Sequence, residues 1–218
     1  MSICTLNIYR FHAKPSKDRS YTPLQLLAAL KRKTKGSLIF VSHCRTISKR
    51  EDVIRELGRY TEITVRGKCE KQLSVNNSLG SEFCKSNCGD DDLIATHRFY
   101  LAFENSICDE YITEKFYVRI TELLVPVVLE RKIYTDTGIP PDSFIAADDF
   151  NSVAELGEYL NYLRKNDTAY LRYFAWTQYY RKPIYQTSAM CNLCEDIYKG
   201  KKIIASDINK SFNINDCH

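Results

Sequence analysis

The sequence has no long apolar segment and no recognisable targeting segment. Every apolar run in the 218 residues is only a few residues long, whereas a membrane-spanning helix needs roughly 20. Residues 1–11 lack the basic, apolar and small-residue regions of a signal peptide. As given, the sequence therefore predicts a soluble chain.

Glycine is scarce, and neither GxGxxG nor GxxxxGK[ST] occurs. This absence argues against a dinucleotide dehydrogenase and against a P-loop NTPase. The four histidines share no motif, and His43 and Cys44 are adjacent residues that point to opposite faces if they lie on a strand. A Cys/His hydrolase is therefore disfavoured. The net charge of +4 comes from scattered basic residues, which argues against nucleic-acid binding.

Cysteine is abundant, with nine residues. Two close pairs lie about a hundred residues apart, which is too far for a compact zinc site with two ligand pairs. Disulfides in a secretory compartment are favoured instead, and an oxidising lumen without an import signal predicts that the N-terminus is incomplete. The disulfide candidates are Cys69, Cys84, Cys88, Cys191 and Cys194, and the glycosylation candidates are the sequons at Asn76, Asn166 and Asn209.

Capped amphipathic helices alternate with short apolar segments along the chain. Capping boxes are predicted at Thr22 with Gln25 and at Ser48 with Glu51. Further helix starts are predicted at Thr113, at Ser152 with Glu155, and at Asn166 or Asp167; the first helix has Leu26, Leu27 and Leu30 on its apolar face, and Gly36 and Gly58 end the first two helices.

Strands are expected near residues 37–41, 61–65, 98–104, 125–129 and 143–147, and residues 66–95 are interpreted as a polar excursion. Strands that alternate with amphipathic helices indicate an α/β fold with a mostly parallel sheet covered on both faces. Ligands bind such sheets beyond the carboxyl ends of the strands.

Two predicted helix starts carry a cation in the first turn: Arg50 and Lys115. A cation there opposes the partial positive charge of the helix N-terminus. The arrangement is favourable if an anion binds at the same place, because helix amides and the cation then converge on it. The structural alternative is that both side chains extend into solvent.

The loop before the second of these helices is rich in polar groups suited to a sugar-bearing anion. Glu114 is placed to accept the two hydroxyls of a ribose, although a carboxylate at this position also satisfies the helix dipole. Asn105 and Tyr111 suit either a ligand or the loop itself. A diphosphate held by side chains and helix ends, without close-approaching glycines, is typical of a nucleotide-sugar site.

The chain resembles the C-terminal half of the α1,3-fucosyltransferases, glycosyltransferase family 10. The resemblance rests on four blocks between residues 99 and 176, and on a C-terminal cysteine pair. In order, the blocks read FENSICDEYITEKFY, VPVVL, IPPDSFIAADDFNSVAELGEYLNYL and DTAYLRYFAW, and the cysteine pair reads CNLC. The pattern FENSxxxxYxTEK is highly specific.

The resemblance implies a Rossmann-like parallel sheet flanked by helices, the C-terminal half of a GT-B glycosyltransferase. It implies that Arg50 and Lys115 hold the diphosphate of GDP-fucose, that Glu114 holds the ribose, and that Asn105 and Tyr111 line the phosphate and fucose side. The implied reaction is inverting transfer of L-fucose from GDP-fucose to GlcNAc of a glycan or glycoprotein. No obligate cofactor or metal is implied, and divalent cations are expected at most to stimulate.

The resemblance also sets the expected organisation and location. Residues 1–35 are interpreted as an arm and linker helix, 36–178 as the GDP-fucose-binding domain, and 179–218 as a tail with the CxxC. The family's presumed catalytic base lies in an N-terminal domain without a counterpart in this chain, so no catalytic residue is predicted here. A Golgi enzyme, anchored through a segment absent from this chain and present here in truncated form, is expected. The alternative is a non-catalytic module that binds GDP-fucose or GDP.

Overall fold

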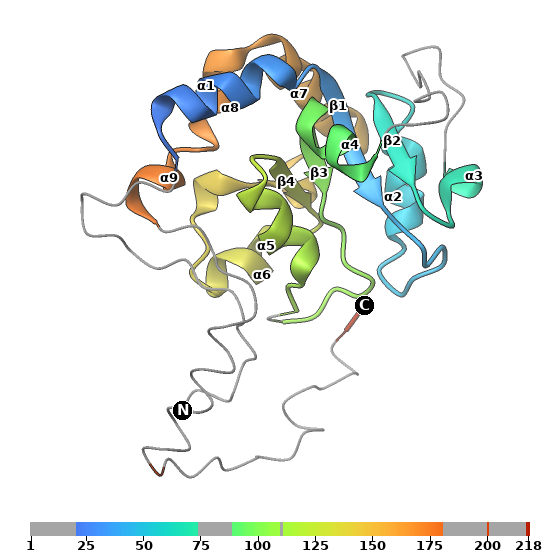
Figure 1. Cartoon of the computed structure of the whole chain (residues 1–218). Helices are drawn as coiled ribbons and strands as arrows, with labels where there is room; N and C mark the ends of the chain where they lie inside the picture. Colours follow the sequence, from blue (N-terminus) through green and yellow to red (C-terminus); the bar gives the residue numbers. More distant parts are fainter. Residues whose placement is uncertain (1–20, 74–88, 110, 181–199, 201–216) are drawn as a thin grey trace.

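A computed structural model describes residues 21–73, 89–109, 111–180, 200 and 217–218. Within these ranges five parallel strands form one sheet in the order β2-β1-β3-β4-β5 (Figure 1). The strands are β1 (Lys35–Phe40), β2 (Ile63–Arg66), β3 (His97–Leu101), β4 (Val125–Val128) and β5 (Ile145–Ala146). The predicted parallel α/β fold is confirmed.

Helices connect the strands and lie on both faces of the sheet (Figure 1). In chain order they are α1 (Pro23–Arg32), α2 (Arg50–Leu57), α3 (Glu70–Leu73), α4 (Asp90–Thr96), α5 (Glu114–Thr121), α6 (Arg131–Asp136), α7 (Val153–Lys165), α8 (Asp167–Arg172) and α9 (Trp176–Tyr179), with short 3-10 turns at Pro141–Ser143 and Ala147–Asp149. None of the described helices has the length and apolarity to cross a bilayer.

Alternate residues of each strand feed two separate cores, as the period of two along a strand requires. Ile39, Phe99 and Leu101 belong to the core shared with α2 and α7. Leu38 and Tyr100 face the opposite core, which is shared with α4, α5 and α6. Both faces of the sheet are therefore buried, which explains why its strands are apolar throughout.

Most predicted helix caps are present. Thr22 and Gln25 form the reciprocal capping box of α1. The hydroxyl of Ser152 accepts a hydrogen bond from the Glu155 amide at the start of α7, and the Thr113 hydroxyl accepts one from the Lys115 amide. Asn166, one of the two predicted starts, caps α8.

Two local predictions for the N-terminal part were wrong. Gly36 does not end α1 but lies inside β1, where an added Cβ would lie 2.5 Å from the Glu62 carbonyl oxygen of the neighbouring chain segment. Leu27 was expected on the apolar face of α1, yet it is 50% exposed, while Leu30 is buried. The close approach of Glu62, a long-range contact that no local pattern encodes, explains the position of Gly36.

The predicted capping box of Ser48 and Glu51 was also wrong. Helix α2 begins after Lys49, a residue in the left-handed region with φ of 50°, and it has no side-chain cap. The Glu51 carboxylate accepts hydrogen bonds from the amide and hydroxyl of Thr46. The Ser48 hydroxyl donates to the backbone oxygen of Glu104, so it joins two loops instead of capping a helix.

Candidate functional site

The site lies at the carboxyl edge of the sheet, between β1 and β3. After β1 the chain leads through α2 to β2 on one side, and after β3 it leads through α5 to β4 on the other. The loops that follow these two central strands therefore diverge. This divergence defines a topological switch point, the place where open parallel sheets bind ligands.

Hydrogen bonds join the two diverging loops at their base. The Ser48 hydroxyl and amide donate to the backbone oxygens of Glu104 and Asn105, at 2.8 and 3.1 Å. Arg50 Nη1 donates to the Phe103 backbone oxygen at 2.6 Å. The start of α2 and the end of the β3 segment thus form one connected unit.

Glu104 organises the second helix start. One of its carboxylate oxygens accepts hydrogen bonds from the amide and hydroxyl of Thr113, at 2.9 and 2.7 Å. The other accepts from Lys115 Nζ at 2.8 Å, and the same ammonium also donates to the Thr113 hydroxyl at 2.9 Å. Because Glu104 is 5% exposed and Lys115 is 18% exposed, this is a largely desolvated ion pair.

Both predicted cations lie in the field of Glu104. Burial by itself would lower the pKa of Lys115, but the charge and hydrogen bond of Glu104, with smaller contributions from Glu114 and Tyr111, together outweigh burial, and the pKa is raised. Burial lowers the pKa of Arg50, and Glu104 and Glu51 oppose that change only in part. A guanidinium remains charged under these conditions. Arg50 therefore binds the backbone at Phe103, and Lys115 binds the carboxylate of the next residue, Glu104.

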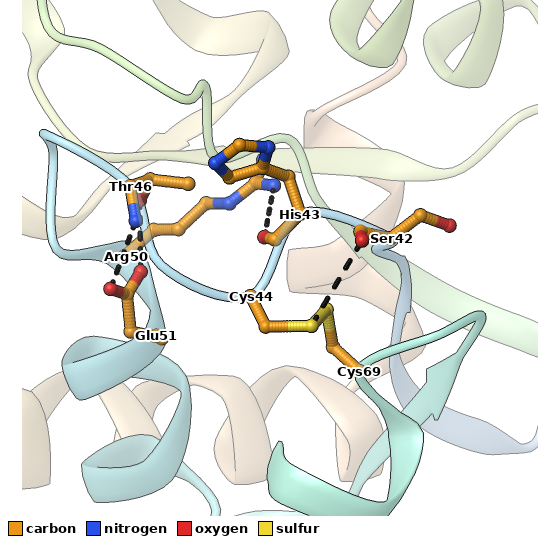
Figure 2. Close-up of a disulfide and its surroundings, with 7 residues drawn as sticks. All are labelled: Ser42, His43, Cys44, Thr46, Arg50, Glu51 and Cys69. Carbon is orange, nitrogen blue, oxygen red and sulfur yellow. Dashed lines mark hydrogen bonds between the residues drawn. A yellow bond between two sulfur atoms is a disulfide. The ribbon is translucent and has the colours of Figure 1, made fainter.

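Arg50 is held more tightly than a first-turn cation at a surface. It is 3% exposed, and its Nη2 donates to the His43 backbone oxygen at 3.2 Å, as Figure 2 shows. The structural alternative, a side chain extended into solvent, does not apply to it. Two buried polar atoms of this region, Arg50 Nε and Asn105 Oδ1, have no hydrogen-bond partner among the described residues.

A small hollow lies on the β4 side of the same edge. Of the predicted site residues, only Tyr111 lines it; Glu114 is 62% exposed and lies 3.6 Å from the Lys115 ammonium. Site prediction from the motif missed most of the lining, which comes from the segment after β4 and from α6 as well as from the loop before α5. The lining residues are Glu104, Ser106, Ile107, Tyr111, Leu129, Glu130, Ile133 and Tyr134.

Two disulfides stabilise the loops around the site. The predicted candidate Cys69 is bonded to Cys44, which ties the loop after β1 to the start of α3 (Figure 2). A second disulfide joins Cys108 to Cys217. The predicted disulfide candidates did not include Cys44, Cys108 or Cys217, because a pairing partner distant in sequence leaves no local signal. Cys84, Cys88, Cys191 and Cys194 lie outside the described residues.

Of the three sequons, only Asn166 lies in the described part of the chain. Its side-chain oxygen accepts a hydrogen bond from the Ala169 amide at 3.0 Å, and its Nδ2 donates to the Tyr162 hydroxyl at 2.9 Å. The side chain therefore caps α8. Asn76 and Asn209 lie outside the described residues.

A parallel α/β domain with charged side chains converging on its switch point has the architecture of nucleotide-binding proteins. The family model described as "Glycosyltransferase family 10 (fucosyltransferase) C-term" matches residues 30–211. The chain therefore belongs to glycosyltransferase family 10, as its sequence motifs predict.

Relatives with curated names agree with this membership. The chain is 43% identical over 150 residues to the Caenorhabditis elegans alpha-(1,3)-fucosyltransferase fut-1, covering 68% of this chain and 33% of that protein. It is 34% identical over 166 residues to the Drosophila melanogaster alpha-(1,3)-fucosyltransferase C, covering 76% and 36%. The chain thus spans about a third of the length of these relatives.

The fold has a counterpart among solved structures. A crystal structure of an alpha1,3-fucosyltransferase with GDP-fucose superposes with a TM-score of 0.54 at 20% identity, covering 82% of this chain and 49% of that one. At this identity the likeness concerns the fold alone. It agrees with the prediction of a GT-B type Rossmann-like half.

Proposed function

We propose that residues 36–178 form the GDP-fucose-binding domain of an α1,3-fucosyltransferase. The observation that carries the proposal is the Lys115–Glu104–Thr113 cluster at the first turn of α5, beside the switch point. In support, the family model matches residues 30–211, which include this segment, and relatives named alpha-(1,3)-fucosyltransferases match 68% and 76% of the chain.

Lys115 is arranged to accept an additional anion. An ammonium has three donors, and two of those of Lys115 are directed to Glu104 and Thr113. The third makes no hydrogen bond to a described residue, and the exposed Glu114 carboxylate lies 3.6 Å from the ammonium; in the proposal this donor turns to a phosphate oxygen. The partial positive charge of the α5 N-terminus adds to the attraction, and we assign the adjacent, exposed Glu114 to the ribose.

Arg50 and Asn105 are also assigned to the proposed donor site. Buried polar atoms without partners cost about 1–3 kcal/mol each. Among the described residues, Arg50 Nε and Asn105 Oδ1 are two such atoms, on the loops that diverge at the switch point. Oxygens and hydroxyls of a bound nucleotide sugar supply suitable partners. We therefore assign Arg50 and Asn105 to the phosphate side and Tyr111 to the sugar side.

The proposed reaction is a single in-line displacement that transfers fucose to a GlcNAc hydroxyl and inverts the sugar carbon. Positive side chains stabilise the departing diphosphate, and a base takes the acceptor proton. We assign the catalytic base to no residue of this chain. No step of the proposed reaction requires a metal, and divalent cations are expected at most to stimulate the transfer. Disulfides at the site suit an oxidising compartment such as the Golgi lumen.

Titration calorimetry tests binding directly. GDP and GDP-fucose are expected to bind saturably. UDP and ADP serve as controls for recognition of the guanine nucleobase. Lys115→Ala is expected to weaken GDP binding, and Arg59→Ala serves as a control, because it removes an exposed ion pair with Glu56 at the C-terminal end of α2, outside the proposed site. No saturable binding of GDP to folded wild-type protein would refute the proposal.

A transfer assay then separates the enzyme from a non-catalytic module. Radiolabelled GDP-fucose is incubated with a GlcNAc-terminated glycan, with and without added divalent cation. Fucosylated product identifies a transferase, and the anomeric configuration of the product tests inversion. Tight GDP binding without product favours the binding module.

A further inference from the structure

Residues 217–218 lie against the loop that carries the proposed donor site. Cys217 is disulfide-bonded to Cys108 across a sequence separation of 109. The Ile107 amide donates to the backbone oxygen of His218 at 2.6 Å, and the His218 amide donates back to the Ile107 oxygen at 3.0 Å. Figure 1 places the C-terminus beside the loop between β3 and α5.

The same two residues also reach the loop after β4. The His218 ring nitrogen Nε2 lies 3.1 Å from a carboxylate oxygen of Glu130. Glu130 and Ile107 both line the hollow beside the site. Residues 217–218 therefore connect two loops that form opposite parts of that hollow, through one covalent bond, two backbone hydrogen bonds and one side-chain contact.

We propose that Cys217 and His218 are positioning residues of the donor site. They hold loop 104–113 in the conformation in which Ser106 and Tyr111 face the hollow, before any ligand arrives. Ordering a loop at the moment of binding costs affinity, so a loop that is already ordered binds more tightly. This inference rests on the proposed function, because it gives the ordered loop a donor to bind.

The main test compares the oxidised wild-type protein with the Cys108→Ser/Cys217→Ser double variant. GDP binding is measured by calorimetry at a temperature at which circular dichroism shows both proteins folded. The double variant is expected to bind GDP about tenfold more weakly, equivalent to about 1.4 kcal/mol. Hydrogen exchange is expected to speed up in the 104–113 loop but not in β4.

A gentler variant keeps the test informative if the double variant does not fold. His218→Ala leaves the disulfide intact and removes only the Glu130 contact. Since the His218 side chain is 72% exposed, we expect GDP binding to weaken only about two- to threefold. His218→Gln keeps an N–H donor for Glu130 and should restore the affinity, and Arg59→Ala should leave it unchanged.

The outcomes separate this inference from the proposed function. If the wild-type protein binds no GDP, the proposed function fails, and loop exchange alone decides whether residues 217–218 order the loop. If the wild type binds GDP and the double variant binds it equally well, Cys217 and His218 do not position the donor site. Faster loop exchange with unchanged affinity would overturn the inference as well.

Discussion

Replacing Lys115 with methionine removes one charge from the site and keeps most of the apolar stem. In the wild-type protein the ammonium pairs with the buried Glu104 carboxylate and donates to the Thr113 hydroxyl. The variant leaves that carboxylate without its cation, although Thr113 still donates two hydrogen bonds to it. We expect Lys115→Met to lower the free energy of unfolding by about 1–3 kcal/mol, the cost of a buried group that loses a partner.

Binding should respond differently from folding. A charge-assisted contact to phosphate is worth about 1.5–3 kcal/mol, so GDP affinity should fall roughly ten- to a hundredfold. The double variant Lys115→Met/Glu104→Gln replaces the carboxylate that has lost its cation with a neutral amide. It should recover most of the lost stability and little of the lost affinity.

The measurement is a double-mutant cycle of four proteins: the wild type, Lys115→Met, Glu104→Gln and the double variant. Urea denaturation gives their stabilities, and calorimetry gives their affinities for GDP. If the double variant regains wild-type affinity for GDP, Lys115 serves only to neutralise Glu104, and the assignment to the diphosphate is wrong. If Lys115→Met binds GDP as tightly as the wild type while remaining folded, the site itself is wrong.

Three further predictions test other parts of the structure. Glu114→Gln should weaken GDP binding roughly tenfold or more, as expected for loss of a charged hydrogen-bond acceptor; it should barely change the affinity for 2′,3′-dideoxy-GDP, which lacks both ribose hydroxyls, and equal losses for both nucleotides would contradict a ribose contact. Burial lowers the pKa of His97 to about 4, so its neutral form contributes stability above about pH 6.5, and about 3 kcal/mol of that is lost as the pH falls towards 4. Urea denaturation across this range should show a smaller loss for His97→Gln, and equal pH dependence in the two proteins would refute the assignment. Peptide mapping of the non-reduced protein should recover the linked pairs Cys44–Cys69 and Cys108–Cys217 found among the described residues, and alkylation of any of these four thiols would contradict the structure.

Local pattern was sufficient to predict much of the fold. Thr22, Thr113 and Ser152 cap helices as expected because a cap involves only the next few residues. Ser48 was misassigned because its hydroxyl reaches Glu104, more than fifty residues away. Gly36 was misassigned because its role depends on how closely β2 approaches β1. Features set by residues close in sequence, such as helix caps, can be predicted from one sequence. Features set by contacts between distant strands and loops cannot.

The candidate site divides in the same way. Glu114 and Lys115 follow from the position of the α5 start, and the motif places Tyr111 on the adjoining loop. The pairing of Cys108 with Cys217 depends on the folded topology, and so does the hollow, which is lined from the segment after β4 and from α6. The structure therefore adds to the predicted residues the contacts that fix their positions.

The two first-turn cations, expected to act alike, have different surroundings. Arg50 directs two guanidinium nitrogens to the backbone oxygens of Phe103 and His43, a use that suits a rigid, forked donor. Lys115 directs two of its three donors to side chains and retains one. Removing Arg50 must therefore disturb the junction of both loops together with any ligand contact, so lost binding in an Arg50 variant cannot identify a phosphate contact. For Lys115, by contrast, substitution of Glu104 can compensate for the lost structural role. Folding and anion binding can therefore be measured separately for this residue.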